Sequence, residues 1–343
     1  MPLLVLDLQA TSRNWRLTPA AERAIIAAAP PGWRVANVTA PTSSDGDGAA
    51  GPSDEALDLV RTAEAYVGFG MSRPLFAAAP RVRWVHSAAA GVAGVLYDEM
   101  RTSDVTLTNS AGVHAIPIAE YVVAGVLYLL RGFDMAVSQQ RAGIWDKSPF
   151  VREGSVIREM GECRALIVGA GGLGSAIGAR LSLLGAHCTG VRRRPELGPP
   201  PGFERVVGPD TLDNELPSAD IVVLCAPFTP STRDLMTAER LARLPAGAIV
   251  VNVARGALLD EVALADGIRA GRLRGAVLDV FREEPLAPDS PLWLLPSVLV
   301  TPHVSPVSPG RFWERELALI LENWGRYTRG EPLVNVVDKA AGY

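Results

Sequence analysis

The chain has 343 residues, of which 48% are hydrophobic and 20% are charged, and its formal net charge is −4. A chain of this length is too long for one hydrophobic core, so we expect two domains with a ligand-binding cleft between them. The balanced composition excludes a disordered or low-complexity protein. No run of basic residues occurs except Arg192, Arg193 and Arg194, which argues against a nucleic-acid surface.

The cysteines and the apolar segments exclude further classes. Cys163, Cys188 and Cys225 are far apart and form no CxxC pair, so we expect buried structural thiols and no metal site. The N-terminal segment MPLLVLDLQA lacks the basic residues that begin a secretory signal. The longest apolar stretch, Ala115–Leu130, contains a proline and a glutamate and is shorter than the roughly 20 residues of a membrane span. We therefore expect a cytoplasmic protein with no membrane partner.

The first 108 residues alternate short apolar runs with helix-like runs, which predicts a small parallel sheet. These runs cover residues 3–8, 20–29, 33–38, 54–61, 66–68 and 82–86. Residues 41–53 are rich in Gly, Ser and Asp and predict a surface loop. Residues 114–133 are apolar on every face, which predicts a buried helix and a candidate hinge between the two domains.

From residue 164 to residue 303 the alternation of strands and helices becomes more regular. The predicted strands are ALIVG, HCTGV, IVVLCAP, AIVVNVA, GAVLDVF and VLVTPH. They are rich in Val, Ile and Leu and show no period of two, as in parallel strands that are covered on both faces. A last helix over residues 311–327 and the tail then return to the first domain. The fold class is therefore α/β, with two flavodoxin- or Rossmann-like doubly wound parallel-sheet domains, residues 1–108 with 306–343 and residues 109–305.

The segment GAGGLG matches the G-x-G-x-x-G pattern, and a predicted strand, helix and second strand surround it as a βαβ unit. Gly169 makes the tight turn, Gly171 lets the backbone approach a pyrophosphate, and Gly174 packs the helix against the strand. N–H groups at the start of the helix, which include those of Gly172 and Leu173, then hold the phosphates. Residues 109–305 are thus predicted to bind a dinucleotide. The alternative is a structural glycine turn.

The residues after the second strand of this unit indicate the choice of coenzyme. An NAD-binding unit has Asp or Glu here for the ribose 2′-hydroxyl, whereas this sequence has Arg192, Arg193 and Arg194. Guanidinium groups suit a 2′-phosphate because they make charge-assisted hydrogen bonds to it. The sequence therefore predicts NADP (NADPH) as the preferred cofactor and NAD as a weaker coenzyme. The alternative is that the three arginines belong to a solvated loop.

Three further motifs end later strands: NVARG at residues 252–256, DVFREEPL at 279–286 and TPH at 301–303. In this order after G-x-G-x-x-G, they resemble the D-isomer-specific 2-hydroxyacid dehydrogenase family over nearly the whole chain. The segments SPLWLLPSVLVTPHV and VDKAAGY are most similar to its glyoxylate/hydroxypyruvate reductase branch. The resemblance implies reduction of a small 2-oxo acid to the 2-hydroxy acid by hydride transfer. Residues 1–108 with 306–343 would then form the substrate domain, with the active site in the cleft.

The resemblance implies that Arg255 binds the substrate carboxylate and carbonyl, that His303 is the general acid/base and that Glu284 pairs with this histidine. A planar guanidinium can hold a carboxylate that lies beside a carbonyl. Hydride transfer leaves negative charge on the carbonyl oxygen, and a histidine whose charged form is stabilised by a carboxylate can supply the proton. Taken one at a time, the alternatives are an Arg in a surface loop, a Glu at a helix cap and a His in the core.

The same resemblance implies the remaining contacts. The N–H groups of Ala90 and Gly91, in a loop of small residues, would bind the substrate carboxylate, and Asp279 would lie near the nicotinamide. Backbone contacts to the cofactor are expected at the ends of two strands, from Ala226, Pro227, Val253 and Ala254. Residues 139–150 resemble the projecting dimer loop of the family, which implies a homodimer. Trp145 would then cap the substrate pocket of the partner or be buried in the dimer contact.

The sequence departs from the commonest family pattern at three places. Ala93 stands where Asp is frequent, Val304 and Pro306 flank the serine that follows the catalytic histidine, and arginines replace the acid after the second strand. The first two departures affect the substrate pocket and the third affects the cofactor. Two other functions are a cofactor-sensing binding protein without turnover and a dehydrogenase for a phosphorylated hydroxy acid. The dehydrogenase for a phosphorylated hydroxy acid would need a basic pocket, for which Arg73 and Arg81 are the candidates.

Overall fold

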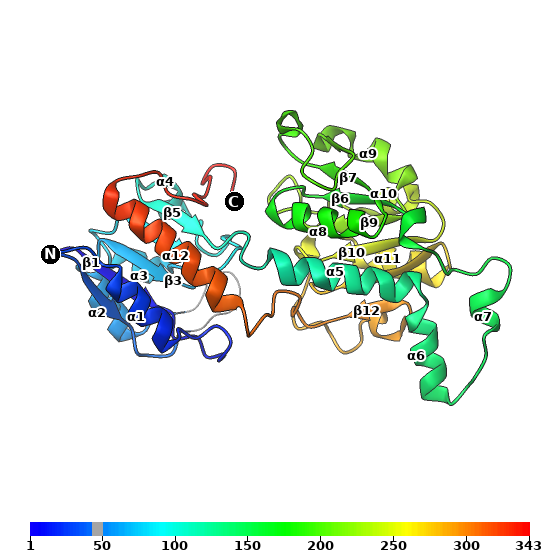
Figure 1. The fold of residues 1–343 in the computed structure, drawn as a ribbon, viewed down its shortest axis with the longest axis horizontal. Helices are drawn as coiled ribbons and strands as arrows, with labels where there is room; N and C mark the ends of the chain where they lie inside the picture. The colour runs from blue at the N-terminus through cyan, green and yellow to red at the C-terminus, as the bar shows by residue number, and fades with distance from the viewer. Residues whose placement is uncertain (43–50) are drawn as a thin grey trace. The chain divides into compact units, whose positions relative to one another are not determined.

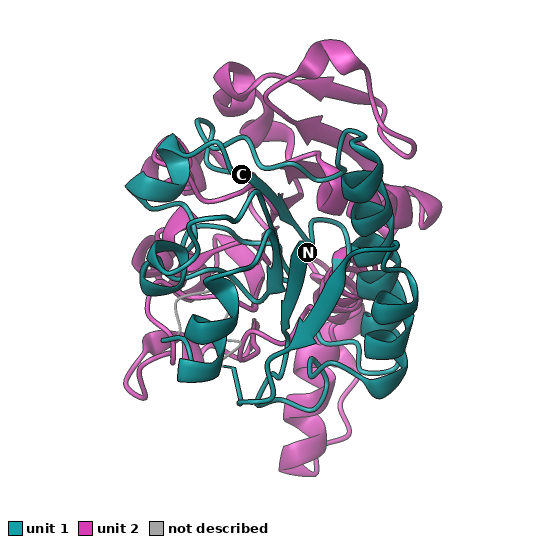
Figure 2. Ribbon diagram, turned by 90° about the vertical axis from the view of Figure 1, so that its left-hand side faces the viewer, with its two compact units in different colours: residues 1–114, 307–343 teal, residues 115–306 magenta. Residues whose placement is uncertain are grey.

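The computed structural model describes residues 1–42 and 51–343, which form two compact units (Figure 2). The first unit contains residues 1–114 and 307–343, and the second contains residues 115–306. The sequence placed these divisions at 108/109 and 305/306. Residues 43–50, within the loop predicted over 41–53, lie outside the described residues.

The first unit is a parallel sheet between two layers of helices. Its described strands follow the order β2-β1-β3-β4-β5, and all neighbours are parallel. The strands are β1 (Leu3–Asp7), β2 (Arg34–Asn37), β3 (Ala65–Gly68), β4 (Trp84–Ser87) and β5 (Thr106–Asn109). Helices α1 (Pro19–Ala27) and α12 (Phe312–Arg329) pack on one face of the sheet (Figure 1). Helices α2 (Asp54–Val60), α3 (Arg73–Ala77) and α4 (Asp98–Thr102) cover the other face.

Helix α12 belongs to the first unit although it lies near the end of the chain. Its Trp324 is fully buried and stacks on the ring of Trp84 of β4, with 6.2 Å between the ring centroids. Ile320, one turn earlier, is also fully buried in the same cluster. Residues 335–337 then run beside β5, where the amide of Val337 donates to the carbonyl of Leu107. The C-terminal segment thus completes the edge of this sheet.

The second unit is a larger parallel sheet, with the order β12-β11-β10-β9-β6-β7-β8 among the described residues. The strands are β6 (Arg164–Val168), β7 (His187–Val191), β8 (Arg205–Val207), β9 (Ile221–Leu224), β10 (Ala248–Asn252), β11 (Leu273–Leu278) and β12 (Val298–Val300). Helices α5 (Ala115–Leu130) and α8 (Gly172–Leu183) pack on one face. Helices α9 (Leu212–Glu215), α10 (Ala238–Arg243) and α11 (Glu261–Arg269) pack on the other. Two parallel-sheet α/β units confirm the predicted fold class.

The strand order of the second unit reverses between β6 and β9. The chain proceeds from β6 to β7 and β8 on one side, and then returns to β9 on the other side of β6. In doubly wound sheets, ligands bind outside the carboxyl ends of the strands at such a reversal. We therefore expect a binding site of this unit at the residues that follow β6 and β9.

The single helix predicted over residues 114–133 is two helices, α5 and α6 (Phe133–Ala142), which are bent by 67°. Gly132 between them has a φ of +68°, in the left-handed region that favours glycine. Helix α6 is held to the sheet by Arg274 of β11, whose guanidinium donates to both carboxylate oxygens of Asp134 at 2.6 and 2.8 Å. Beyond α6, the chain forms the short helix α7 (Ser148–Val151), which projects with α6 from the body of the unit (Figure 1).

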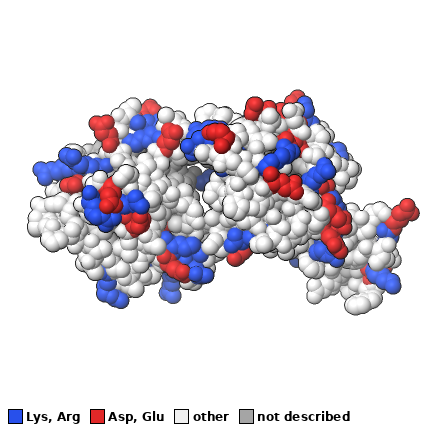
Figure 3. Space-filling view, turned by 45° about the horizontal axis from the view of Figure 1, so that its top comes forward, with Lys and Arg blue, Asp and Glu red and all other residues white. Residues whose placement is uncertain are grey.

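In the described part of the chain, no single helix is long and apolar enough to cross a membrane. Helices α5 and α6 meet the criterion only when taken together across their bend. On the face drawn in Figure 3, basic and acidic side chains are interspersed. Elsewhere in the described chain, opposite charges pair within one helix, as in the contact of Arg326 with Glu322 of α12 at 2.6 Å.

Candidate active site

The glycine-rich turn joins β6 to α8 at the reversal of the strand order. Gly169 has a φ of +111°, and a Cβ atom there would lie 2.5 Å from the backbone nitrogen of Ala226. A Cβ atom on Gly174 would lie 2.3 Å from the carbonyl oxygen of Gly169. Both positions therefore exclude a side chain, as the roles predicted for them require. At Gly171, in contrast, a Cβ atom would meet no described atom within 4 Å, so the backbone there is open to an approaching group.

Helix α8 begins directly in this turn. The first amides of a helix, here including those of Gly172 and Leu173, have no acceptor within the helix. They lie next to the open side of the turn at Gly171, where the helix dipole also favours an anion. Close backbone packing at two glycines and an open surface at the third fit a pyrophosphate group.

The three arginines follow β7, next to β6 in the sheet, but they do not have equal surroundings. Arg192 is half-buried, and its Nη2 donates to the carbonyl of Gly198 at 2.7 Å. This contact closes the loop of residues 192–198. Arg193 and Arg194 are exposed. Arg192 therefore shapes the loop, and Arg193 and Arg194 carry its exposed positive charge.

Of the four residues at the strand ends beside the turn, Ala226, Val253 and Ala254 are buried and Pro227 is exposed. Ala226 and Pro227 follow β9, and the carbonyl of Pro227 accepts a hydrogen bond from the Thr232 hydroxyl at 2.7 Å. Val253 and Ala254 follow β10 and are both nearly buried. Side chains here are small, so contacts to a cofactor would come from the backbone.

Arg255 lies in a turn that its neighbours hold firmly. The fully buried Asn252 accepts from the amide of Ala254 at 3.1 Å and donates to the carbonyl of Arg255 at 2.9 Å. A Cβ atom on Gly256 would lie 1.8 Å from the backbone of Phe281, so only glycine fits there. The guanidinium of Arg255 donates to the carbonyl of Ala254 at 2.7 Å. Sequence reasoning quoted Asn252 and Gly256 as letters of a motif but gave them no role.

The structure brings His303 and Glu284 together. The Nδ1 atom of His303 lies 2.9 Å from Oε2 of Glu284, and Oε1 of Glu284 accepts from the amide of Phe281 at 2.9 Å. If Nδ1 carries the proton of this hydrogen bond, Nε2 is left for a ligand. Among the described residues, Nε2 has no hydrogen-bond partner. Both side chains are a little over one third exposed, so the pair is accessible to a substrate.

Asp279 supports the segment that carries His303. Its carboxylate is fully buried and accepts from the amides of Val304 and Ser305 at 2.8 and 2.9 Å. It also accepts from the Thr301 hydroxyl at 2.5 Å, and the Tyr121 hydroxyl in turn lies 2.7 Å from that of Thr301. Burial raises the pKa of Tyr121 to about 12, so this phenol remains a donor. The expected contact of Asp279 with the nicotinamide stays a prediction.

The loop that contains Ala90 and Gly91 belongs to the first unit and follows β4. Ser87 at its start is fully buried, whereas Ala90 is exposed. Within residues 1–42 and 51–343, the amides of Ala90 and Gly91 have no hydrogen-bond acceptor. Two unpaired N–H groups in an exposed loop fit the predicted contact with a carboxylate.

Trp145 lies in the segment between α6 and α7, and its side chain is fully exposed, at 101%. Ile144 beside it and Val151 of α7 are also exposed, at 55% and 69%. These side chains belong to the projecting segment of the second unit, and the described residues leave each of them more than half exposed. Trp145 is therefore available to another molecule, as the predicted dimer contact requires.

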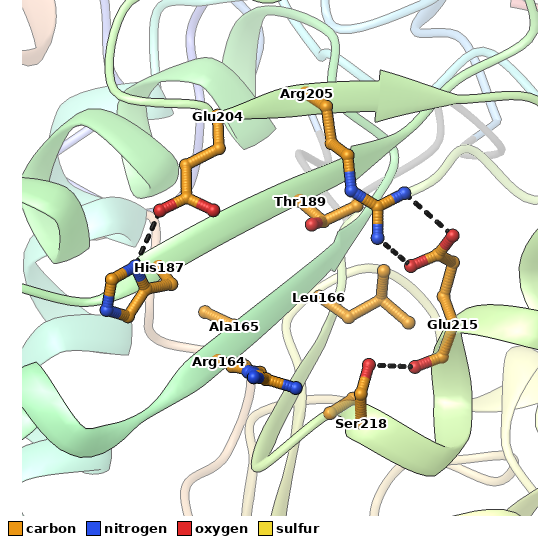
Figure 4. Close-up of a pocket in the computed structure, with 10 residues that line it drawn as sticks. Arg164, Ala165, Leu166, His187, Thr189, Glu204, Arg205, Glu215 and Ser218 are labelled. Atoms are coloured by element: carbon orange, nitrogen blue, oxygen red, sulfur yellow. Dashed lines mark hydrogen bonds and ion pairs between the residues drawn. The ribbon is translucent and has the colours of Figure 1, made fainter.

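The remaining histidines have partners of their own. His86 is buried between Thr108 and Glu316, His114 stacks on Phe312 with 5.5 Å between the ring centroids, and His187 contacts Glu204 at 2.5 Å. His187 lines a shallow pocket of about 270 Å³ at the amino ends of β6 and β7 (Figure 4). This pocket is at the opposite end of the strands from the glycine turn, and Glu204, Arg205 and Glu215 in it are already paired.

The described residues contain no group of three His, Cys, Asp or Glu that could hold a metal ion. Cys163 and Cys188 are buried, and Cys225 lies beside the glycine turn, where burial raises the pKa of its thiol to about 12. All three cysteines are free. The site is thus built from backbone amides, a guanidinium and a histidine–carboxylate pair. Together with the strand reversal, these features define a dinucleotide-binding protein of the doubly wound class.

Comparison with known proteins identifies the family. A model of the D-isomer specific 2-hydroxyacid dehydrogenase NAD binding domain matches residues 123–305. Glyoxylate/hydroxypyruvate reductase A of Salmonella newport (strain SL254) is 32% identical over 273 residues, which cover 77% of this chain and 82% of that protein. The chain belongs to the D-isomer specific 2-hydroxyacid dehydrogenase family, and its second unit is the NAD-binding domain. The family expected from the motifs is confirmed.

Other relatives carry other names. D-3-phosphoglycerate dehydrogenase of Mycobacterium leprae (strain TN) is 36% identical over 256 residues, which cover 75% of this chain. The matched region spans only 46% of the length of that relative. Family membership therefore leaves the substrate to be inferred from the site itself.

Solved structures of the family have the same fold. A D-isomer specific 2-hydroxyacid dehydrogenase from Xanthobacter autotrophicus Py2, in complex with NADPH and MES, is 32% identical with a TM-score of 0.80. The alignment covers 100% of this chain and 99% of that chain. The NADPH-dependent glyoxylate/hydroxypyruvate reductase from Sinorhizobium meliloti, in complex with NADP and sulfate, is 27% identical with a TM-score of 0.77, and each chain is covered completely.

Proposed function

We propose that this protein reduces a small 2-oxo acid of the glyoxylate or hydroxypyruvate type to the 2-hydroxy acid, with NADPH as the preferred coenzyme. The observation that carries the proposal is the His303–Glu284 pair, which holds a histidine with an available Nε2 atom. The same unit presents the guanidinium of Arg255 and the open turn at Gly171. A proton donor, a carboxylate-binding group and a dinucleotide turn are the parts that this reaction needs.

The chain's own residues would act as follows. Arg255 binds the carboxylate and the carbonyl oxygen of the substrate and so fixes its orientation. The amides of Ala90 and Gly91 donate to the carboxylate. His303 holds a proton at Nε2 and gives it to the carbonyl oxygen, and Glu284 stabilises the charged histidine before the transfer. NADPH, when bound at the glycine turn, supplies the hydride, so that hydride and proton together convert the carbonyl to an alcohol.

The preference for NADPH is supported by the exposed charge of the loop that follows β7. Arg193 and Arg194 stand where an acidic residue would bind the 2′-hydroxyl of NAD. NADP binding by the relatives from Xanthobacter and Sinorhizobium agrees with this proposal. NAD, which lacks the 2′-phosphate, would serve as a weaker coenzyme.

A dehydrogenase for a phosphorylated hydroxy acid is the second candidate, favoured by the name of the mycobacterial relatives. It would need a basic pocket, for which the sequence offered Arg73 and Arg81, and Arg81 is an exposed side chain. The Nε atom of Arg73 lies 3.3 Å from Glu99, and its guanidinium lies over the ring of Tyr97 at 5.4 Å. Because its charge is already compensated, a substrate without a phosphate is the better proposal.

Initial rates of NADPH oxidation test the proposal. We expect turnover with glyoxylate, hydroxypyruvate or pyruvate, and lower kcat/KM with longer 2-oxo acids and with 3-phosphohydroxypyruvate. Preference for the phosphorylated acid would select the second candidate. Tight binding of NADPH without oxidation by any 2-oxo acid would instead indicate a cofactor-sensing protein.

A further inference from the structure

The loop that bears the amides of Ala90 and Gly91 is tied to the end of β5 through its carbonyl groups. The amide of Ser110 donates to the carbonyl of Ala89 at 3.2 Å. The side-chain amide of Asn109 donates to the carbonyl of Ala90 at 2.8 Å. Two successive carbonyls of this loop are therefore held by residues 109 and 110.

These two anchors determine where the neighbouring N–H groups point. A trans peptide unit is planar, and its N–H points away from its C=O. The carbonyl of Ala89 shares a peptide unit with the amide of Ala90, and the carbonyl of Ala90 shares one with the amide of Gly91. When both carbonyls face residues 109 and 110, both N–H groups face the opposite direction. Neither of these two amides has an acceptor among the described residues.

We propose that Asn109 is a positioning residue that aims the N–H of Gly91 at the substrate carboxylate by holding the carbonyl of Ala90. The inference rests on the proposed function and adds to it a residue whose described contacts are all within the first unit. Without the side chain of Asn109, the Ala90–Gly91 peptide can rotate, because no other described group holds the carbonyl of Ala90. The N–H would then meet the carboxylate only in part of the conformations of the loop.

Asn109 is itself held rigidly, as a positioning residue must be. Its Oδ1 accepts from the amide of Ala111 at 3.2 Å, so both ends of the side chain are paired and its orientation is fixed. Its backbone amide donates to the carbonyl of Asn335 at 3.2 Å. The side chain of Asn335 donates in turn to the carbonyls of Asn109 and Ala111 at 3.3 and 2.8 Å. The C-terminal segment thus clamps the end of β5.

A buried network anchors the neighbouring Ser110. Its hydroxyl donates to Oε1 of Glu316 at 2.9 Å, and the Nε2 atom of His86 lies 3.3 Å from the same oxygen. The Nδ1 atom of His86 lies 2.9 Å from the hydroxyl of Thr108, which also accepts from the indole of Trp84 at 3.0 Å. His86 and Glu316 are fully buried, so this network joins α12 to the ends of β4 and β5 without contact with solvent. The loop is therefore built on a rigid base.

Two variants of Asn109 test the proposal, with Asn37→Ala as the matched control. Asn109→Ala removes the donor, and Asn109→Leu removes it while keeping the volume. Asn37 is a half-buried residue of β2, at the other edge of the same sheet, and its side-chain amide donates to Glu22 at 3.1 Å. Each protein is assayed for the kcat and KM of its preferred 2-oxo acid, for the Kd of NADPH, and for inhibition by oxamate. Oxamate has the same carboxylate as the substrate and is not reduced.

Because the carboxylate is bound in the ground state and in the transition state alike, we expect KM to rise about tenfold with a smaller change in kcat. This factor corresponds to the loss of about 1.4 kcal/mol of binding free energy. The inhibition constant of oxamate should rise in parallel, with the Kd of NADPH unchanged. Asn37→Ala also removes a side-chain hydrogen bond of the first unit and should leave KM and the oxamate constant as they are.

The possible failures are distinguishable. An unmodified protein that neither reduces a 2-oxo acid nor binds oxamate in the presence of NADPH contradicts the proposed function. The positioning role of Asn109 is then contradicted as well, because it depends on that function. An active unmodified protein, with the same KM and oxamate constant in both Asn109 variants, contradicts the positioning role alone. Equal losses in the Asn109 and Asn37 variants would show a general structural effect and would also contradict the positioning role.

Discussion

At the scale of single residues, the proposed catalytic histidine is held in an uncommon backbone conformation. His303 has a φ of +53°, which non-glycine residues rarely adopt. Its amide donates to the carbonyls of Asp279 and Thr301 at 2.9 and 3.0 Å, and the carboxylate of Asp279 holds the next two amides. Strain of this kind persists where the surroundings over-determine the conformation, as is frequent at functional sites. The buried Asp279 thus fixes the position from which His303 can reach a substrate.

Replacing His303 tests its role in proton transfer. We expect His303→Ala to lower kcat by about 10²- to 10⁴-fold, the usual contribution of a positioned acid, with the Kd of NADPH unchanged. Glu284→Gln should also lower kcat, because a neutral amide stabilises the charged ring less than a carboxylate does.

His187→Ala is the control for these variants, since His187 is at the opposite end of the strands and contacts only the exposed Glu204 in the described structure. It should behave like the unmodified protein in both measurements. Near-normal turnover of His303→Ala would remove His303 from the mechanism. An unchanged kcat in Glu284→Gln would contradict the functional link between the two residues.

The exposed arginines predict coenzyme selectivity. Hydrogen bonds to charged groups contribute about 1.5–3 kcal/mol each, and each 1.4 kcal/mol is a factor of ten. After allowance for solvent screening, we expect a preference of about tens to hundreds for NADPH over NADH in kcat/KM, and this preference should fall with added salt.

Replacing Arg193 and Arg194 together by Ser should remove most of that preference by weakening NADPH and barely changing NADH. Arg192→Ser is the comparison, because Arg192 also holds the carbonyl of Gly198 and its loss should weaken both coenzymes. Equal kcat/KM with NADPH and NADH in the unmodified protein would contradict this prediction and would indicate that the arginines belong to a solvated loop.

The sequence predicted the residues that lie within motifs and missed those that act across the fold. Arg255, Glu284 and His303 follow recognisable strands, so their order alone suggested a common site. Tyr121 reaches Thr301 across 180 residues of sequence. No local pattern marks such a contact, because it depends on how α5 packs on the sheet. Asn252 carried a weak signal, since an asparagine that directly follows a buried strand commonly binds the turn after it.

At the scale of secondary structure elements, strands were predicted most closely where both faces of the sheet are covered. Strand β7 has the bounds of the predicted run HCTGV, and β6 begins and ends one residue before the predicted run ALIVG. The helix over residues 114–133 was predicted too long, because Gly132 adopts a left-handed conformation and ends α5. A glycine inside an apolar run can either continue a helix or end it. Here the contact of Asp134 in α6 with Arg274 favours the bend at Gly132.

The buried pair of Asp134 and Arg274 predicts a large loss of stability when it is broken. Both side chains are less than one tenth exposed, and Arg274 also donates to the carbonyl of Leu129 at 2.8 Å. Asp134→Ala would leave the guanidinium buried without its carboxylate, and we expect the free energy of unfolding to fall by about 3–5 kcal/mol. Thermal and denaturant unfolding measure this change.

Glu331→Ala provides the comparison, since it breaks the exposed pair of Arg329 and Glu331 at the end of α12. Exposed ion pairs contribute little, so the unfolding transition should barely move. A similar small effect of Asp134→Ala would show that the chain accommodates the buried guanidinium without its carboxylate, and that α6 is held by other contacts.

At the scale of the whole molecule, the projecting segment of α6 and α7 differs from the rest of the described surface. Phe133, Ile144, Trp145 and Val151 are all more than half exposed and follow one another within 19 residues of sequence. Large apolar side chains that gather on a projecting segment mark an interaction surface. We propose a second copy of this chain as the partner, because the segment resembles the dimer loop of the family to which the chain belongs.

The dimer predicts a twofold mass in solution and a specific sensitivity to charge in this segment. Sedimentation equilibrium should give about twice the mass of the single chain. Ile144→Asp should shift the protein toward the monomer, because a carboxylate would have to be desolvated in the contact. Leu294→Asp, at a side chain of the same unit that is 83% exposed, should leave the mass unchanged.

Trp145→Ala then separates the two roles proposed for the tryptophan. If Trp145 caps the pocket of the partner, KM for the 2-oxo acid should rise while the mass stays twofold. If it is buried in the contact, the dimer should weaken while KM at high protein concentration stays the same, since tryptophan is a frequent source of binding energy at interfaces. A monomeric unmodified protein with full activity would contradict the proposed partner.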